Sequence, residues 1–300
     1  MASADWRFGV IFLFEIGIGA SGNLALLCHY CILCCRGCRP RSTDVILRHL
    51  TVANTLAILS RGIPETMAAF GMEGFLSDAG CKPVFYAHRV GRGASMGSTC
   101  LLSVFQAVGI GPRRSRGAEL KAKALNHIGS SSALCWGLHM PLSVRVPVLG
   151  SDTGVNGNIT ETVDFQCCSA TLPDKDKASL FGVLTLSHDI LCLELMVWAS
   201  GSTVFILFRH KQRVHHLHSH KISSRPSPET RATQSIVILV CAFVSFHALS
   251  SIIYFLFPLH YETAWWLVKT SAVSNACFPT AGPLILLSRE QCVSRVIWKK

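Results

Sequence analysis

Ionisable side chains at helical spacing fall within apolar stretches of this sequence. Arg61 and Glu65 are four residues apart, so the pair lies on one face of a helix. His88 and Arg92 have the same spacing, and Arg89 adjoins His88. A charged group inside a bilayer costs free energy and is a candidate functional group by default. Two interpretations are open: the five side chains line a ligand pocket, or they form a network of ion pairs between the two helices that carry them and so fix the packing of these helices.

Two further carboxylates, Asp189 and Glu194, share another apolar stretch. Five residues turn a helix through about 500°, so the two side chains point roughly 140° apart and do not converge on one substrate. Acid–base catalysis by paired carboxylates is therefore not predicted, and we expect no enzymatic activity. Glu194 falls near the middle of its stretch, where it must face the interior, take up a proton or be misplaced.

Five of the 14 cysteines gather near the start of the chain: Cys28, Cys31, Cys34, Cys35 and Cys38. The simpler interpretation is that these thiols serve as small apolar side chains, and the alternative is acylation near a membrane. A zinc site is not predicted, because no fourth ligand follows at a matching spacing. The histidine-rich run 215–220 is expected to be a solvated loop, so we predict no metal and no cofactor.

The composition indicates what kind of elements position these residues. Apolar residues make up 50% of the chain and charged residues only 15%, and the mean hydropathy is +0.39. Soluble domains carry about 25% charged residues, so a soluble fold would lack the charge to cover its surface. Disorder is excluded because disordered chains are poor in apolar residues. The composition therefore predicts a membrane protein.

Seven stretches are long and apolar enough to cross a hydrocarbon layer about 30 Å thick as helices. They cover residues 8–33, 46–69, 84–110, 127–149, 178–208, 233–257 and 264–287. The sequence thus predicts an all-α membrane protein, a single domain over residues 1–300 that forms a seven-transmembrane helix bundle. The third and fourth stretches are rich in Gly, Ser or Pro, which is typical of central helices that pack closely.

The basic residues are distributed asymmetrically over the connections. Nineteen of the 28 lysines and arginines follow the first, third, fifth and seventh stretches. That side carries about +15 and the rest about −4, out of a total of +11. The positive-inside rule then predicts an extracellular N-terminus and a cytoplasmic C-terminus. Nucleic-acid binding is not expected from basic residues scattered over four segments, and the expected partners are the lipid bilayer and cytosolic proteins.

On this topology three cysteines and a glycosylation motif face the outside. Cys81 begins the third stretch, and Cys167 and Cys168 lie in the second outer connection. Because the outside is oxidising, we expect a disulfide between Cys81 and Cys168, with Cys167 as the alternative partner. Asn158 begins an Asn-Ile-Thr acceptor for N-linked sugar in the same connection.

Longer strings carry a family resemblance. They include LRHLTVANTLAILSRGIPETMAAFG, FLSDAGCKPVFYAHRVGRGASMGSTCLLSVFQA, MVWASGS and RHKQRV. Gly22, Asn23 and Asn54 also fit the plan of a G protein-coupled receptor, although the Asp-Arg-Tyr and Asn-Pro-x-x-Tyr signatures of rhodopsin-like receptors are missing. From Phe8 to Lys300 the chain resembles the vomeronasal type-1 receptors.

The resemblance implies a plasma-membrane receptor for a pheromone or small volatile odorant. The ligand would bind in the outer half of the bundle, where the charged residues of the second and third stretches are the pocket candidates. Signalling would pass through a heterotrimeric G protein of the Gi/Go class. The candidates for facing that protein are Arg113, Arg114, Arg116, Arg209, Lys211 and Arg213.

Several residues depart from the family pattern. Relatives usually carry Ser at the position of Gly111, Trp at Gly117 and often a small residue at Glu194. These changes touch coupling and membrane insertion, so a family member with little or no signalling is an open alternative. A small membrane transporter is a remote alternative, because no repeated halves are visible in the sequence.

Overall fold

The structure, a computed structural model, describes residues 2–37, 42–72, 78–110, 127–143, 162–164, 169–171, 175–217, 228–256 and 264–297. Within these ranges the chain forms seven helices and one short hairpin. The helices are α1 (Ala2–Cys35), α2 (Ser42–Ala69), α3 (Asp78–Ile110), a fourth helix over 127–143, α5 (Lys175–Leu217), α6 (Pro228–Leu256) and α7 (Ala264–Ile297). Strands β1 (Thr162–Asp164) and β2 (Ser169–Thr171) pair antiparallel. The predicted helical bundle is confirmed, and the hairpin is an addition to it.

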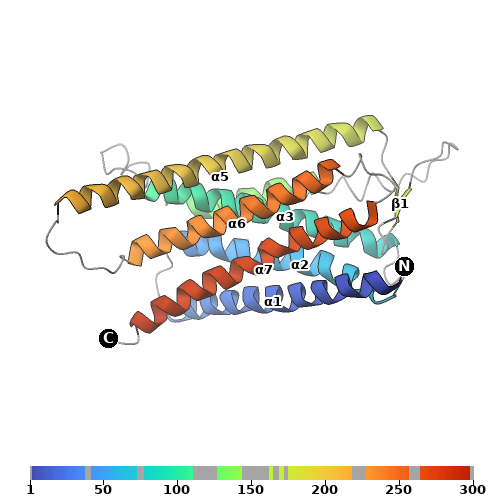
Figure 1. Cartoon of the computed structure of the whole chain (residues 1–300), viewed down its shortest axis with the longest axis horizontal. Coiled ribbons are helices and arrows are strands. Elements are labelled where there is room, and N and C mark those ends of the chain that lie inside the picture. The colour runs from blue at the N-terminus through green and yellow to red at the C-terminus, as the bar shows by residue number, and fades with distance from the viewer. Residues whose placement is uncertain are drawn as a thin grey trace.

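The helices lie side by side along the long axis of the molecule (Figure 1). α2 packs between α1 and α3, and α3 also contacts α5 and α6. α7 packs against α1, α2 and α6. α1 begins and α7 ends at opposite ends of the bundle (Figure 1).

Three helical segments are long and apolar enough to cross a membrane: Trp6–Cys35, Gly80–Ile110 and Ser187–Arg209. Shorter apolar stretches of helix cover Ile236–Ser250 and Ala272–Leu287 within the described residues. α2 is not in this set. It carries charged residues along its length, but the side chain of its Glu65 is buried inside the bundle.

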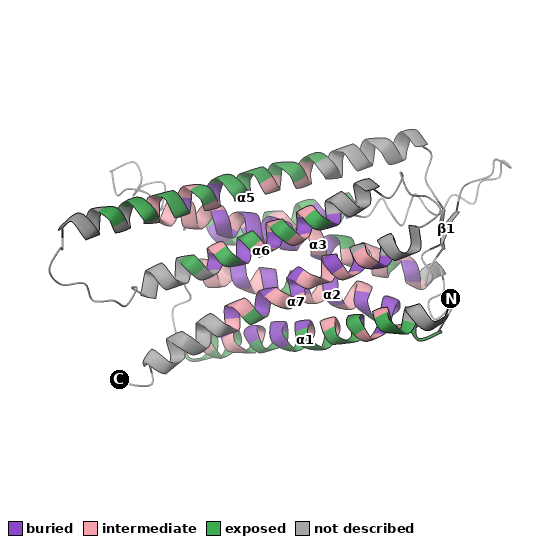
Figure 2. Ribbon diagram, in the orientation of Figure 1, coloured by how far each residue is buried: buried purple, intermediate pink, exposed green. Residues whose placement is uncertain are grey.

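Apolar side chains cover the outside of the bundle as well as its interior. Figure 2 shows buried residues toward the middle and exposed residues on the outer faces. On α5, Leu191 and Trp198 are 65% and 67% exposed. A soluble monomer rarely exposes a large contiguous apolar surface, whereas a helix that faces lipid requires one.

The predicted close packing of a central helix is right for α3. Half of its apolar window is buried (50%), compared with 28% for α1 and 17% for α5. A Cβ on Gly91 would lie only 2.8 Å from the backbone nitrogen of Ala57 on α2. The fourth helix is less central, since Leu134 and Leu138 are exposed, but it also packs closely, because a Cβ on Gly97 of α3 would lie 2.9 Å from Cys135 Sγ. The glycines of the fourth helix itself face outward and bring no helix closer.

Buried hydrogen bonds join the helices where backbone or side chains would otherwise lack partners. Pro283 lies four residues after Pro279 in α7 and has no N–H, so the Pro279 carbonyl loses its usual helical donor. Asn23 on α1 supplies one, with its Nδ2 donating to that oxygen at 3.0 Å. Between α3 and α2, the Ser95 hydroxyl donates to Asn54 Oδ1 at 2.7 Å.

Candidate functional site

A cavity lies between α1, α2, α3, α6 and α7, in the half of the bundle that holds the beginning of α1. The volume open to the centre of a water molecule is about 50 Å³, which is room for a few waters. A larger ligand must therefore displace side chains to enter. The cavity also lies beside the Ser95–Asn54 hydrogen bond, since Ser95 is part of its lining.

Basic and aromatic side chains share the lining. Phe243 on α6 stacks parallel to His247 with 5.8 Å between ring centroids, and Phe278 on α7 meets Phe243 edge-on at 4.4 Å. Such a lining can hold an apolar body against rings while N–H groups bind an oxygen acceptor. The basic and aromatic members are Arg61, His88, Arg92, His247, Phe12, Phe243, Phe246 and Phe278.

The backbone of α2 fixes the orientation of His88. Its Nδ1 lies 3.2 Å from the carbonyl oxygen of Ala57. A carbonyl only accepts, so this hydrogen bond requires the proton on Nδ1. In the neutral imidazole Nε2 is then left as an acceptor.

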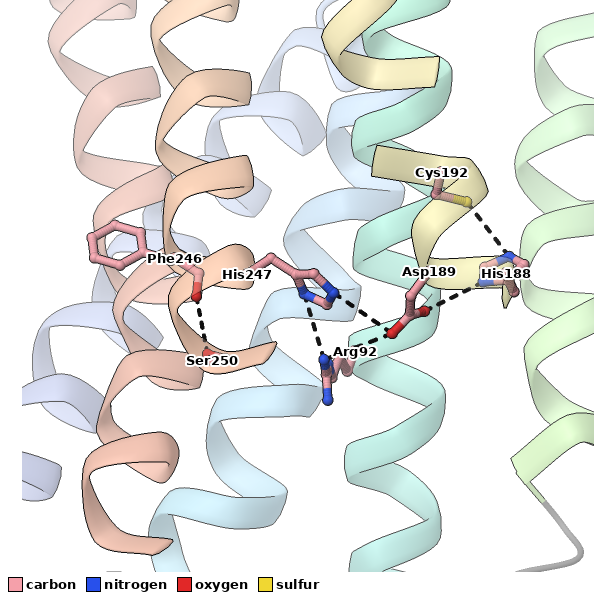
Figure 3. A network of polar contacts seen from close by, with 7 residues as sticks. All are labelled: Arg92, His188, Asp189, Cys192, Phe246, His247 and Ser250. Atoms are coloured by element: carbon pink, nitrogen blue, oxygen red, sulfur yellow. Dashed lines mark hydrogen bonds and ion pairs between the residues drawn. The ribbon is translucent and has the colours of Figure 1, made fainter. Parts of the chain in front are cut away.

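A polar network joins α3, α5 and α6 beside the cavity (Figure 3). Asp189 Oδ2 lies 3.8 Å from Arg92 Nη2 and 3.6 Å from His247 Nε2. Arg92 Nη2 and His247 Nδ1 are 3.5 Å apart. These distances exceed those of short charge-assisted hydrogen bonds, so the carboxylate attracts both basic groups without a tight directional hydrogen bond. One carboxylate on α5 thus holds two basic groups that line the cavity.

The network extends along α5 to the fourth helix. His188 Nδ1 lies 3.4 Å from Asp189 Oδ1, and its Nε2 lies 3.6 Å from Cys192 Sγ. The His188 ring meets the His139 ring edge-on at 4.9 Å between centroids. Asp189 therefore connects contacts from four helices.

A second ion pair joins α2 to α7. Lys269 Nζ lies 2.8 Å from Glu65 Oε2, and Arg61 Nε lies 3.8 Å from Glu65 Oε1. Lys269 and Glu65 are only 5% and 6% exposed. Buried charges persist only when paired and hydrogen-bonded, so this pair restrains the contact between α2 and α7 where Arg61 reaches the cavity.

Comparison with known proteins identifies the fold that carries this cavity. The model of the vomeronasal organ pheromone receptor family matches residues 6–299. The chain belongs to this family. It is a chemosensory receptor of the G protein-coupled type, and the relatives below show how far the likeness extends.

The receptor is 50% identical to vomeronasal type-1 receptor 2 of Homo sapiens over 284 residues, which cover 95% of this chain and 72% of the relative. It is 48% identical to vomeronasal type-1 receptor 3 of Homo sapiens over 300 residues, covering 99% and 95%. A more distant relative, olfactory receptor class A-like protein 1 of Danio rerio, is 28% identical over 282 residues, covering 93% and 88%.

The five pocket candidates of the receptor divide into two groups. Arg61, His88 and Arg92 line the cavity. Glu65 lies behind it in the ion pair with Lys269, and Arg89 is exposed and outside the lining. The two interpretations of these residues, a pocket lining and a network of ion pairs, are therefore compatible, because Arg61 and Arg92 line the cavity and also take part in ion pairs.

The ion pairs that join helices in the structure are not the ones expected from the sequence, which would have joined the second helix to the third. They run from α2 to α7 and from α3 to α5 and α6. Sequence reasoning missed Lys269 and His247, and it did not connect Asp189 with Arg92. Lys269 falls inside the predicted stretch 264–287, but the charge-free run that marks this stretch begins one residue later, at Thr270.

Glu15 on α1 is a further group that the sequence search left out. Its Oε1 lies 3.5 Å from Cys277 Sγ on α7, and its backbone oxygen accepts from the Thr280 hydroxyl at 3.2 Å. The buried Oε2 has no hydrogen-bond partner among the described residues. Glu15 falls inside the predicted stretch 8–33 but just before the charge-free run from Ile16 to Cys35 that marks it.

Other predicted sites fall partly or wholly outside the described residues. Cys81 is disulfide-bonded, while its pairing with Cys168 or Cys167 stays a prediction. Arg209 is exposed on α5, and Lys211 and Arg213 follow on the same helix with side chains outside the described set. Also outside it are Asn158, Gly111, Gly117, Arg113, Arg114 and Arg116.

Proposed function

We propose that this receptor binds a pheromone or small volatile odorant in the cavity between α2, α3, α6 and α7. The observation that carries the proposal is the lining itself, in which Arg92 and His247 stand beside the rings of Phe243 and Phe278. The small free volume favours a small ligand. Its fit would require an apolar body and at least one oxygen that accepts a hydrogen bond.

The proposed orientation places this cavity on the outer side of the plasma membrane. It rests on the excess of basic residues after the first, third, fifth and seventh spans. We call the half of the bundle that holds the cavity the outer half, and the other the inner half. The basic end of α5 from Arg209 onward then lies on the cytosolic side, where it would attract an acidic surface of a Gi/Go-class heterotrimeric G protein.

The network at Asp189 supports a route from ligand to helix movement. Arg92 on α3 and His247 on α6 both line the cavity and both contact the same carboxylate on α5. A ligand oxygen that accepts from Arg92 or His247 competes with Asp189 for their donors. Binding would then weaken the link of α5 to α3 and α6 and shift the population toward a different helix arrangement.

The test uses full-length receptor in cultured cells, with surface staining and a readout of G-protein activation. A panel of volatile and steroid-like compounds provides the ligands. For any active compound, Arg92→Gln is expected to raise the half-maximal concentration at least tenfold, because it removes a charge from the lining. Arg89→Gln, an exposed neighbour on the same helix, is the matched control and should change it less than twofold. Normal surface display with an unchanged response of Arg92→Gln would remove Arg92 from the pocket.

A further inference from the structure

Four cysteines lie on the outside of α1. Cys28, Cys31, Cys34 and Cys35 are all exposed. Cys100 on α3, in contrast, is buried, so if the four thiols of α1 serve as small apolar side chains, they do so against lipid. These four thiols face away from the bundle and fill no part of its interior.

Their depth along α1 separates them into two pairs. The apolar segment Trp6–Cys35 has 30 residues, about 45 Å of helix at 1.5 Å per residue. This exceeds a hydrocarbon layer of about 30 Å, so its ends reach the headgroup regions. Cys34 and Cys35 form the end of the helix, whereas Cys28 lies about 10 Å deeper. Cys31 is about 5 Å deeper than Cys34, so the terminal pair lies nearest to the membrane surface.

Positive charge surrounds the terminal pair. Arg48 Nη1 on α2 donates to Cys34 Sγ at 3.3 Å. Arg36 follows Cys35 directly, and Gly37, with a φ of 68°, ends the helix. A thiol reacts as its thiolate, and reactive cysteines sit in exposed, electropositive surroundings. Cys34 meets both conditions, since it is exposed and in contact with a guanidinium, and Cys35 is exposed beside it.

We propose that Cys34 and Cys35 are S-acylated by long-chain acyl-coenzyme A. The cysteine thiolate attacks the carbonyl carbon of the acyl thioester. A new carbon–sulfur bond to cysteine forms, the bond to the coenzyme sulfur breaks, and the coenzyme leaves as a thiolate that takes up the proton released by the cysteine. The inference rests on the proposed orientation, because acyl-coenzyme A is a cytosolic donor.

The attached chains have a place on the surface of α1. Leu24 and Ile32 are 60% and 52% exposed on the outside of this helix, so acyl chains can lie along an apolar surface in the inner leaflet. Two chains at one helix end would tie α1 to that leaflet more firmly than a single chain. The modification would thereby hold the inner end of α1 at a fixed depth.

The experiment labels full-length receptor in cells fed an alkynyl fatty acid, followed by purification and attachment of a fluorophore. The expected result is label on the native receptor that neutral hydroxylamine removes, as it does for thioesters. The variant with Cys34→Ser and Cys35→Ser should retain less than a fifth of the label per receptor. The matched variant with Cys28→Ser and Cys31→Ser, exposed but deeper, should retain most of it.

Three results would overturn the proposal: no label on native receptor, full label on the Cys34/Cys35 double variant, or loss of label only with Cys38→Ser. Surface staining of each variant shows that it is folded and delivered. A membrane-impermeant thiol reagent, applied to intact and to permeabilised cells after hydroxylamine, tests orientation separately. Reaction at Cys34 and Cys35 in intact cells would refute the proposed orientation together with the acylation, whereas reaction only after permeabilisation with no acyl label would refute the acylation alone.

Discussion

The ion pair between Lys269 and Glu65 is the contact whose loss we expect to destabilise the bundle most. The two charged atoms are 2.8 Å apart, and the residues are 5% and 6% exposed. Removing one partner of a buried pair costs about 3–5 kcal/mol, because the other charge stays buried without compensation. After Lys269→Met, Arg61 Nε still lies 3.8 Å from the carboxylate, so we expect the lower end, about 3 kcal/mol.

Thermal unfolding of purified receptor in detergent measures this cost. With an unfolding entropy of about 2.1 cal/mol/K per residue, a chain of 300 residues loses about 1.6 °C of midpoint per kcal/mol, so Lys269→Met should lower the midpoint by about 5 °C. The scan rate is held fixed, since unfolding of a membrane protein is often irreversible. The double variant Glu65→Gln with Lys269→Met removes both charges and should lose less than the sum of the single variants. Arg89→Gln, exposed on α3, is the control and should shift the midpoint by less than about 1 °C.

Additive losses of stability in the single and double variants would show that Glu65 and Lys269 do not form a stabilising pair. If the double variant loses the sum of the two single losses, the charges do not interact across α2 and α7. A loss for Lys269→Met no larger than that for Arg89→Gln would show that the lysine finds equal compensation elsewhere. Either outcome would remove the ion pair as the restraint beside Arg61.

Three further predictions follow from single contacts. Asp189→Asn removes the charge shared by α3, α5 and α6 and should at least double ligand-independent G-protein activation per surface receptor; an unchanged basal level would contradict the network's role in the resting state. Gly91→Ala places a Cβ 2.8 Å from the α2 backbone and should cut surface display severalfold, whereas Gly137→Ala, which meets nothing within 4 Å, should leave it unchanged. Glu194→Leu should raise surface display by flow cytometry, because Glu194 is exposed on an apolar face of α5 where a charge is costly; lower display would indicate a partner for the carboxylate.

Composition and charge predicted the helical bundle because both signals are local. Each span shows its apolar character within about 20 residues, and the helical spacing of Arg61 and Glu65 predicted a pair that the structure has at 3.8 Å. The five-residue separation of Asp189 and Glu194 also predicted that they point in different directions. In the structure Asp189 is half-buried and Glu194 is exposed.

The partners across helices were not predictable in this way. Glu65 bonds Lys269 across 204 residues, and Arg92 meets His247 across 155. Which face of one helix meets which face of another depends on the packing of the whole bundle, and a search for uninterrupted apolar windows excludes the charged residues that make such contacts. Lys269 and Glu15 were passed over for this reason, although each is a polar group that a membrane helix retains only when it faces the interior.

Two kinds of contact hold the two halves of the bundle, and the proposed movement of helices by a ligand depends on this difference. The outer half holds directional links through Glu65, Asp189 and Asn54. The inner half is packed mainly by apolar side chains from α2, α3 and α6, such as Leu50, Leu102 and Leu239, which are almost fully buried; its contact between Arg48 and Cys34 is exposed. Ion pairs depend on position and orientation, whereas apolar contacts are non-directional and can be remade after a small slide at little cost. On the proposed mechanism, breaking one directional link at the cavity would change which arrangement of the outer half is favoured, and the inner half could follow without losing its core.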